Sequence, residues 1–504
     1  MPAKHIRPAV RRVSDLFQRW RLPLTPASAG LSLFLLSLAL LWQNALSNPL
    51  HESDSALFAA MARDLAAAPV RTWMRIGPQW EWFFYEKPPL ILWAEAAWMR
   101  ILGPAPQAAL LPTLIASHLT VWLVYKIGRR LVDREFGFLA ALILCLTPWF
   151  LKLGRLPKTE PLLMFFMALA LYWGMQIRGG RLYVAGTGIA LALASLAKGP
   201  PALAVIPVWA VYHAMSGAMS GEDGKGKRAE IPWGRLGLAL LIALAVLALA
   251  DLWHYALTGS SFWKRMFAQQ IAPGVLAGRE QAELAKVQSS LFYLKTLLER
   301  YWPWLPFLLA GLFAPWMLPR KDPQRRPLFE AWAFGLTQAG VILLGFSAVP
   351  KKWPAYTHPY HIGLSLLTAL AVYVFLRKRR EIYGHLVAGS AVLAAAVFIL
   401  AALFPPLFQP HPRPQLSGLI RLGEELSLRR ERIGVLQLAN LCNQIGHWSF
   451  RWQAQFYLNV KSISCETEPK GFQLVDLRRD RSYERDGSRV LAVAYPFAIV
   501  ERRP

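Results

Sequence analysis

Cysteine and charged residues are scarce in this sequence, and several common motifs are missing. Its three cysteines form no Cys-x-x-Cys pair and no Cys/His spacing typical of zinc sites. It has no glycine-rich phosphate loop and no Asp-x-Asp motif, so nothing indicates an enzyme that uses a soluble nucleotide. Charged residues make up 17% of the 504 residues, fewer than a soluble protein of this length would carry.

Long apolar runs dominate the chain instead. Hydrophobic residues make up 55% of it, and several runs approach ~20 residues, enough to cross a ~30 Å hydrocarbon core. Only bundled helices fit such runs, so we expect an α-helical polytopic membrane protein. The pattern predicts about eleven spans, at residues 29–47, 108–128, 137–152, 160–177, 182–197, 201–216, 233–255, 300–318, 328–348, 358–376 and 384–404.

Basic residues outnumber acidic ones and give a formal net charge of +26. Nucleic-acid binding would explain this charge, but we do not expect it, because basic residues in polytopic proteins flank the spans on the cytoplasmic side. The tail at 1–28 has no small-residue cleavage site, so we do not expect a cleavable signal peptide. Because the tail is basic, we expect the N-terminus in the cytoplasm. The alternate loops are then short and basic, and the C-terminus lies outside. A substrate that carries phosphate is a second reason for the charge, and both can hold.

Three long segments lie outside in this topology, at residues 48–107, 256–299 and 405–504. The stretch "ALFAAMARDLAAA" is amphipathic and too short to span, so we expect a helix on the membrane surface; "LILWAEAAWMRILG" is a candidate second one. The segments "RIGVLQLAN", "GFQLVDLR" and "RVLAVAYPFAIVE" predict strands of a small α/β domain after the membrane domain at 29–404. Cys442 and Cys465 lie in this outer domain, where oxidation persists, and are expected to form a disulfide.

Two acidic residues at the starts of outer helices are candidates for chemistry. Asp54 precedes the surface helix, where an N-cap is expected; alternatively it is a general base at the membrane boundary, with Glu52 as a nearby substitute. Glu160 opens the fourth span. It is either an acid favoured by the helix dipole or a second catalytic carboxylate that faces Asp54 across one cavity.

The stretch "FFYEKPPLILW" places a lysine between aromatic rings and two prolines. Tyr85 and its neighbours suit the outer lipid–water interface. Lys87 either snorkels to lipid headgroups or, because the prolines stiffen the backbone after it, is held at the depth of a lipid phosphate. Glu86 would orient Lys87 or hold a divalent cation together with His358 or Glu160.

Cationic residues also gather on the outer side, against the usual topology rule. Arg155 and Lys158 lie in the turn "LGRLPKTEP" and need partners there. Arg and Lys from several loops that converge on one site are what a phosphate leaving group requires. The predicted phosphate site comprises Lys87, Tyr85, Arg155, Lys198, Arg265, Lys351 and Tyr356.

The order of these motifs resembles the polyprenyl-phosphate-sugar-dependent glycosyltransferases of the GT-C type, which include protein O-mannosyltransferases and the bacterial lipid A aminoarabinose transferase. The motifs are "DSALFAAMARDL", "EKPPLILW", "KTEPLLMFF", "AKGPPALAVIP" and "KKWPAYTHPYHIGL". Ser55 stands where the family usually has Glu, which leaves Asp54 as the catalytic carboxylate of that motif. Glu160 replaces the commoner Asp. Residues 262–290 do not match the Arg…His segment of the aminoarabinose transferases, which puts their donor and acceptor in doubt here.

The resemblance implies an inverting glycosyltransferase of the bacterial inner membrane. It implies a polyprenyl-phosphate sugar as donor and lipid A, another envelope glycan or a protein as acceptor. No cofactor is certain, although a divalent metal ion is compatible with Glu86 and His358. A lipid-phosphate transporter or flippase is the alternative: it explains the cationic outer ring but not Asp54 beside it. A membrane scaffold with a ligand-binding outer domain leaves the ordered motifs unexplained.

Overall fold

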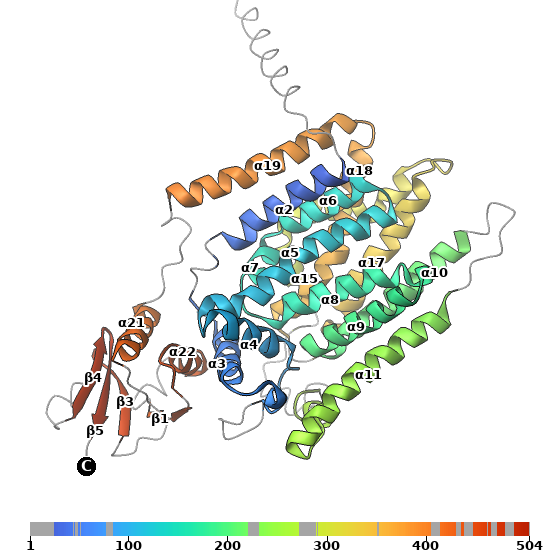
Figure 1. Ribbon diagram of the computed structural model, residues 1–504. Coiled ribbons are helices and arrows are strands. Elements are labelled where there is room, and N and C mark those ends of the chain that lie inside the picture. Colours follow the sequence, from blue (N-terminus) through green and yellow to red (C-terminus); the bar gives the residue numbers. More distant parts are fainter. Residues whose placement is uncertain are drawn as a thin grey trace, which may run out of the picture.

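The computed structural model shows a bundle of helices joined to a smaller unit that contains a sheet (Figure 1). The structure describes residues 25–43, 45, 49–50, 52–76, 84–219, 231–271, 289, 291–349, 352–404, 414–429, 435–437, 447–460, 462–464, 471–478 and 488–502. The predicted Cys442–Cys465 disulfide lies outside these ranges, as does Lys351.

The chain is mostly helical, as the sequence predicts. The α-helices are α2 (Pro26–Trp42), α3 (Ser53–Ala67), α4 (Leu90–Leu102), α5 (Pro106–Leu131), α6 (Arg134–Cys145), α7 (Pro148–Gly154), α8 (Thr159–Gly174), α9 (Arg181–Lys198), α10 (Val205–Met219), α11 (Trp233–Thr258), α12 (Phe262–Met266), α15 (Phe292–Arg300), α16 (Leu305–Phe313), α17 (Arg325–Ser347), α18 (His361–Leu376), α19 (Arg380–Leu403), α21 (Pro414–Leu428) and α22 (His447–Tyr457). Short helical turns are η2 (Val70–Thr72), η3 (Ile177–Gly179), η4 (Pro200–Ala204), η5 (Phe267–Ile271), η6 (Trp302–Trp304), η7 (Ala314–Met317) and η8 (Pro354–Tyr360).

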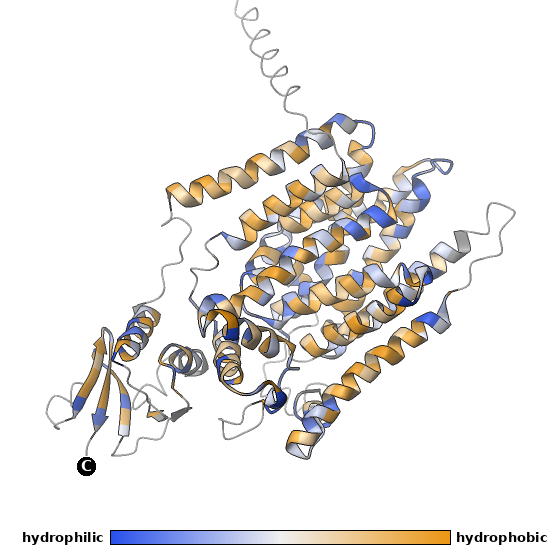
Figure 2. Ribbon diagram, viewed as in Figure 1, coloured by the Kyte–Doolittle hydropathy of each residue, from blue (hydrophilic) through white to orange (hydrophobic). Residues whose placement is uncertain are grey.

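Several of these helices are long and apolar enough to cross a membrane. Among the described residues five qualify, or six if the bent pair α6–α7 is one span, and α2 and α8 are shorter apolar helices. Figure 2 shows apolar residues along α11 and α19, whose side chains are largely exposed, as expected of helices that face lipid. The chain is therefore an integral membrane protein. Every expected span overlaps a helix, and the count of about eleven spans stays a prediction.

One expected span is broken. The range 137–152 is predicted as continuous, but α6 ends at Cys145 and α7 begins at Pro148, with a bend of 66° between the two helices. Proline lacks an N–H and disfavours a helical conformation in the residue before it, so the helix stops at this point. The short α7 then leads back to the loop that starts α8.

Small residues and one glutamine fix the packing of α17 against α18. A Cβ on Gly363 would lie 2.3 Å from the carbonyl oxygen of Gly335, so the two backbones touch only because both residues are glycine. Gln338 donates to the carbonyl of Pro359 at 2.8 Å and accepts from the amide of Gly363 at 2.7 Å. Pro359 has no N–H to donate in the turn before α18. The two bonds of Gln338 supply hydrogen bonding at this turn and hold η8 in place.

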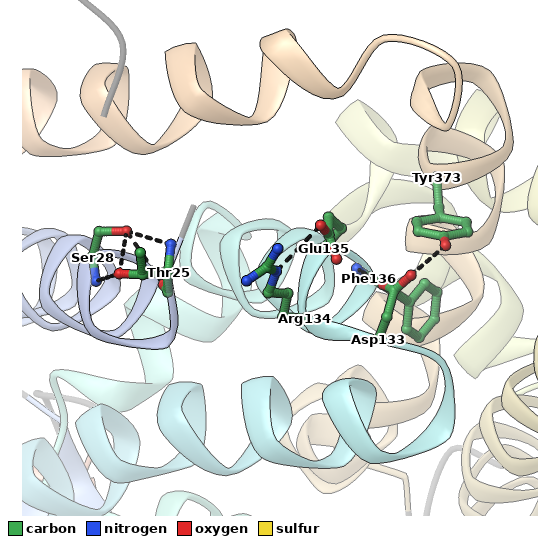
Figure 3. A network of polar contacts seen from close by, with 7 residues as sticks. All are labelled: Thr25, Ser28, Asp133, Arg134, Glu135, Phe136 and Tyr373. Atoms are coloured by element: carbon green, nitrogen blue, oxygen red, sulfur yellow. Dashed lines mark hydrogen bonds and ion pairs between the residues drawn. The ribbon is translucent and has the colours of Figure 1, made fainter. Parts of the chain in front are cut away.

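Polar contacts secure the end of the bundle at the start of α2 and of α6 (Figure 3). Asp133 is the N-cap of α6, accepts from the amide of Phe136 at 2.9 Å, and also accepts from the hydroxyl of Tyr373 on α18. Thr25 and Ser28 form a capping box at the start of α2. Such caps satisfy amides that the helix itself leaves unpaired.

The C-terminal unit contains a five-stranded mixed sheet. Its strands are β1 (Val435–Gln437), β2 (Ser462–Ser464), β3 (Gly471–Asp476), β4 (Arg489–Ala494) and β5 (Phe497–Arg502), in the order β2-β1-β3-β5-β4. β1 is parallel to β2 and β3, whereas β5 is antiparallel to β3 and β4. The stretch "RVLAVAYPFAIVE" forms two strands instead of one, because the chain turns at Tyr495 and Pro496. Strand β2 is absent from the prediction.

Candidate functional site

The candidate base Asp54 lies inside a helix, not before it. Helix α3 begins at Ser53, Glu52 occupies the N-cap without a side-chain cap bond, and Asp54 falls in the first turn. The N-cap expectation for Asp54 is therefore wrong. Its side chain is exposed and makes no hydrogen bond or ion pair with any other residue that the structure describes. A carboxylate in the first turn is stabilised by the helix dipole.

Two contacts join the start of α3 to the loop before α8. Lys158 forms an ion pair with Glu52, and Ser55 donates to the carbonyl oxygen of Pro157 at 3.0 Å. Burial lowers the pKa of Lys158, but the carboxylates of Glu52 and Glu160 outweigh this and raise the pKa above its ordinary value. Lys158 is expected to need a partner, and the structure shows that this partner is Glu52. Ser55, which stands where the resembling family usually has Glu, also has a structural role, because its hydroxyl holds α3 beside this loop.

A buried ion pair connects α8 to α9. Lys198 donates to Glu160, and the two side chains are 7% and 8% exposed. The Lys198 ammonium also lies 4.2 Å from the centre of the Tyr356 ring, a distance typical of cation–π contacts. Glu160 thereby holds a lysine over a tyrosine. This arrangement favours a positioning role for Glu160 over the predicted catalytic one.

Glycine at position 199 brings two lysine motifs together. Gly199 ends α9 with φ +77°, and a Cβ there would lie 4.0 Å from Pro88. The "EKPP" stretch therefore packs beside "AKGPP", and Lys87 is close enough to Lys198 for the two ammonium groups to repel each other. Lys87 makes no ion pair or hydrogen bond with another described residue. An anion beside Lys87 would relieve this repulsion.

Tyr356 lies among three carboxylates. Asp54, Glu86 and Glu160 are all near enough to act electrostatically on its phenol. Its ring also contacts Phe346, with 5.4 Å between ring centres. The structure thus brings together Asp54, Lys87, Glu160, Lys198 and Tyr356, five of the predicted site residues, from α3, the loop before α4, α8, α9 and η8.

Tyr85 faces a neighbouring cluster. Its hydroxyl lies 3.3 Å from His254 Nε2 and 3.5 Å from Ser260 Oγ, and its ring packs against Phe262. His254 Nδ1 lies 2.7 Å from the carbonyl oxygen of Met74. The tyrosine connects the segment at residues 84–89 to the C-terminal end of α11. No sequence signal marks His254 as a partner of Tyr85, because a lone histidine within an apolar helix belongs to no motif.

Two other predicted phosphate ligands have different surroundings. Arg155 donates to the carbonyl of Gln43, the C-cap residue of α2, so its guanidinium caps that helix. Arg265 is exposed on α12, whose Met266 contacts the Gly199 turn. Lys351 lies outside the described residues.

The structure gives the expected metal pair little support. Within the described ranges, no group of three or more His, Cys, Asp or Glu side chains is arranged to hold a metal ion. Glu86 is exposed, whereas His358 is fully buried and stacks on Phe150 with 5.6 Å between ring centres. His358 is therefore part of an aromatic layer with His361 beside it.

Comparisons of sequence place the chain near known glycosyltransferases. Residues 86–253 match the family model for dolichyl-phosphate-mannose-protein mannosyltransferase. An undecaprenyl phosphate-alpha-4-amino-4-deoxy-L-arabinose arabinosyl transferase of Edwardsiella ictaluri (strain 93-146) is 26% identical over 410 residues, which cover 75% of this chain and 66% of the relative. The enzyme with the same description from Pseudomonas aeruginosa (strain LESB58) is 26% identical over 352 residues, 68% of this chain and 60% of the relative. The chain thus spans slightly less than two thirds of the length of these relatives.

Solved structures show the same fold. ArnT from Cupriavidus metallidurans, crystallised with undecaprenyl phosphate, has a TM-score of 0.64 at 14% identity and matches 95% of this chain and 97% of its own. The archaeal oligosaccharyltransferase AglB from Archaeoglobus fulgidus, in complex with an inhibitory peptide and a dolichol-phosphate, has a TM-score of 0.55 at 13% identity, over 91% of this chain and 69% of its own. These likenesses show that the chain shares its fold with ArnT and AglB, which agrees with the predicted α-helical polytopic architecture.

Proposed function

We propose that this chain is an inverting membrane glycosyltransferase. It moves a sugar from a polyprenyl phosphate carrier to an acceptor hydroxyl on the outer side of the bacterial inner membrane. The relatives described as using undecaprenyl phosphate sugars support the donor class. In this proposal the N-terminus lies in the cytoplasm and the sheet-containing unit in the periplasm, as the basic inner loops predict.

One observation carries this function. Asp54 acts electrostatically on Tyr356, and Lys87 acts on Lys198, whose ammonium lies over the Tyr356 ring. Neither Asp54 nor Lys87 forms an ion pair or hydrogen bond with a residue that the structure describes, whereas Glu52 pairs with Lys158 and Glu160 pairs with Lys198. A carboxylate and an ammonium left unpaired within that part of the chain are suited to two different parts of a reaction. The first accepts a proton and the second faces the charge of a leaving phosphate.

The proposed reaction follows from these separate roles of Asp54 and Lys87. Asp54 removes the proton of the acceptor hydroxyl while the oxygen attacks the anomeric carbon from the face opposite the phosphate. The bond from that carbon to the phosphate oxygen breaks, and polyprenyl phosphate leaves with the bonding electrons beside Lys87. Tyr356 and the Glu160–Lys198 pair shape the wall of the site. Removal of one donor to a developing oxyanion typically costs about 2.7–4 kcal/mol.

The test uses purified protein in lipid nanodiscs with undecaprenyl-phosphate sugars labelled in the sugar. Separate reactions contain lipid A, an envelope glycan fraction or an acceptor protein. We expect label in a new glycosidic bond whose anomeric configuration, measured by NMR, is opposite to that of the donor. Movement of the labelled lipid across a liposome membrane without a new bond would support a flippase instead. Retention of configuration would exclude direct displacement with Asp54 as base.

A further inference from the structure

Helix α22 of the sheet-containing unit ends against the helix that carries Asp54. Its last carbonyls belong to the set that a helix leaves unpaired, and Asn459 turns the chain out of the helix with φ 52°. Arg63 of α3 donates to the carbonyl oxygens of Gln455 at 2.8 Å and Phe456 at 3.4 Å, and to that of Val460 at 3.2 Å. A guanidinium here both satisfies carbonyls and complements the helix dipole.

A second hydrogen bond to α22 involves Leu50, which precedes Asp54 in the sequence, whereas Arg63 follows it. The backbone amide of Leu50 donates to the hydroxyl of Tyr457, the last residue of α22, at 2.6 Å. The end of α22 thus holds the chain at Leu50 and again at Arg63. Asp54 lies on the segment between these two attachment points.

The apolar faces of α22 explain how it connects the two units. Trp452 and Phe456 are buried in the same core as α3 and the membrane helices. Ala454 of α22, and Leu458 and Val460 directly after it, are buried in the core of the sheet-containing unit. Figure 1 shows α22 beside α3, between the sheet and the bundle. Because both faces are buried, α22 is fixed to each unit and transmits the position of one to the other.

Arg63 is committed to this contact. Its side chain is 9% exposed, and Asp64 accepts from its Nε at 3.1 Å and from its Nη2 at 2.9 Å. The carboxylate balances the buried charge and orients the guanidinium, while Nη1 and Nη2 reach the end of α22. Lysine cannot reproduce this arrangement, because it has no planar fork of donors.

We propose that α22 positions Asp54 for proton transfer, with Arg63 and Tyr457 as the positioning residues. This inference rests on the proposed function, since it assigns a purpose to the placement of Asp54. The sheet-containing unit would then set the geometry of the base without contributing a group to the reaction. A misplacement of about 1 Å in a catalytic site can cost on the order of 10²-fold in rate.

The experiment compares Tyr457→Phe and Arg63→Lys with wild type by hydrogen exchange and by steady-state kinetics. The matched controls are Tyr495→Phe, on an exposed tyrosine of the same unit, and Arg71→Lys, on an exposed arginine beyond α3. We expect faster exchange over residues 49–63 in both test variants and no change in the controls. We also expect kcat to fall by about tenfold or more at unchanged donor KM, because Lys87 and Lys198 are not touched.

The two readouts separate this inference from the proposed function. Exchange over residues 49–63 that equals wild type in both test variants would show that α22 does not hold α3. Faster exchange with unchanged kcat would show that the contact is structural and does not position the base. A wild-type protein that transfers no sugar would refute the glycosyltransferase proposal, and with it the purpose assigned to this contact, whatever the exchange data show.

Discussion

The ammonium of Lys198 lies over the ring of Tyr356, 4.2 Å from its centre, and is held there by an ion pair with Glu160. The three residues come from α9, η8 and α8. Their contact joins motifs that are far apart in the sequence, and Asp54 and Lys87 are near enough to act electrostatically on Tyr356 and Lys198 respectively.

The Glu160–Lys198 pair gives a prediction on stability. Lys198→Met or Glu160→Gln alone should lower the free energy of unfolding by about 3–5 kcal/mol, because each leaves an uncompensated buried charge. The double variant should be less destabilised than the sum of the single variants. Thermal unfolding in detergent at fixed lipid content measures this. Losses that simply add would contradict a coupled buried pair.

Lys87→Ala should weaken use of the lipid donor more than use of the acceptor. Its ammonium has no ion-pair partner among the described residues and lies near enough to Lys198 to repel its ammonium, so it is available to a phosphate. Part of its effect appears only in the transition state, so kcat should fall along with donor affinity. Lys87→Arg should restore activity only in part. Steady-state kinetics with donor and acceptor varied separately is the measurement, and unchanged donor kinetics in Lys87→Ala would mean that the lysine only snorkels to lipid headgroups.

Glu95 gives a prediction on pH dependence. It is buried on α4, neither carboxyl oxygen bonds to another group in the described ranges, and burial raises its pKa well above the ordinary value. Folding therefore favours the protonated form. The resulting stability is fully present below the unfolded pKa of about 4.3 and is lost as pH rises through the raised pKa.

Thermal unfolding from acidic to alkaline pH tests the Glu95 prediction. Glu95→Gln should lose less stability than wild type as pH rises, because its side chain does not ionise. Glu299→Gln is the matched control, since the Glu299 side chain is 52% exposed. Parallel curves for wild type and Glu95→Gln would show that Glu95 is not the titrating group.

Cys442 and Cys465 should be joined in a disulfide. Both lie outside the described residues, and the prediction depends on their location in the outer domain. Quantitative thiol labelling of the unreduced, denatured protein should detect Cys145 alone, which is a free buried cysteine. Three labelled thiols per chain would contradict the bridge.

The sequence predicts much of the helical bundle and proposes residues for the site, but it does not predict which of the charged residues pair with each other. Arg155 and Lys158 both need partners as outward cations. Only the structure shows that one caps α2 through Gln43 and the other pairs with Glu52. Long side chains from distant segments meet through tertiary packing, which hydrophobic periodicity does not encode.

Contacts between residues that are far apart in the sequence could not be predicted from the sequence either. Arg63 is separated from its carbonyl partner Gln455 by 392 positions, and neither residue belongs to a motif with known spacing. In contrast, the break at Pro148 carried a signal, because proline in an apolar run marks a helix end or kink. The range 137–152 therefore contains two helices, α6 and α7, that bend at Pro148.

The most direct test of the account is the turnover of Asp54→Asn. The substitution keeps the size of the side chain and removes the carboxylate at an exposed position, so folding should be largely intact. Turnover should fall by roughly 10²–10⁴-fold, the usual contribution of a general base. Glu52→Gln is the matched neighbour: it breaks the ion pair with Lys158 and should lower stability while turnover persists. Transfer by Asp54→Asn at more than about a tenth of the wild-type rate would contradict the role of Asp54 as the base.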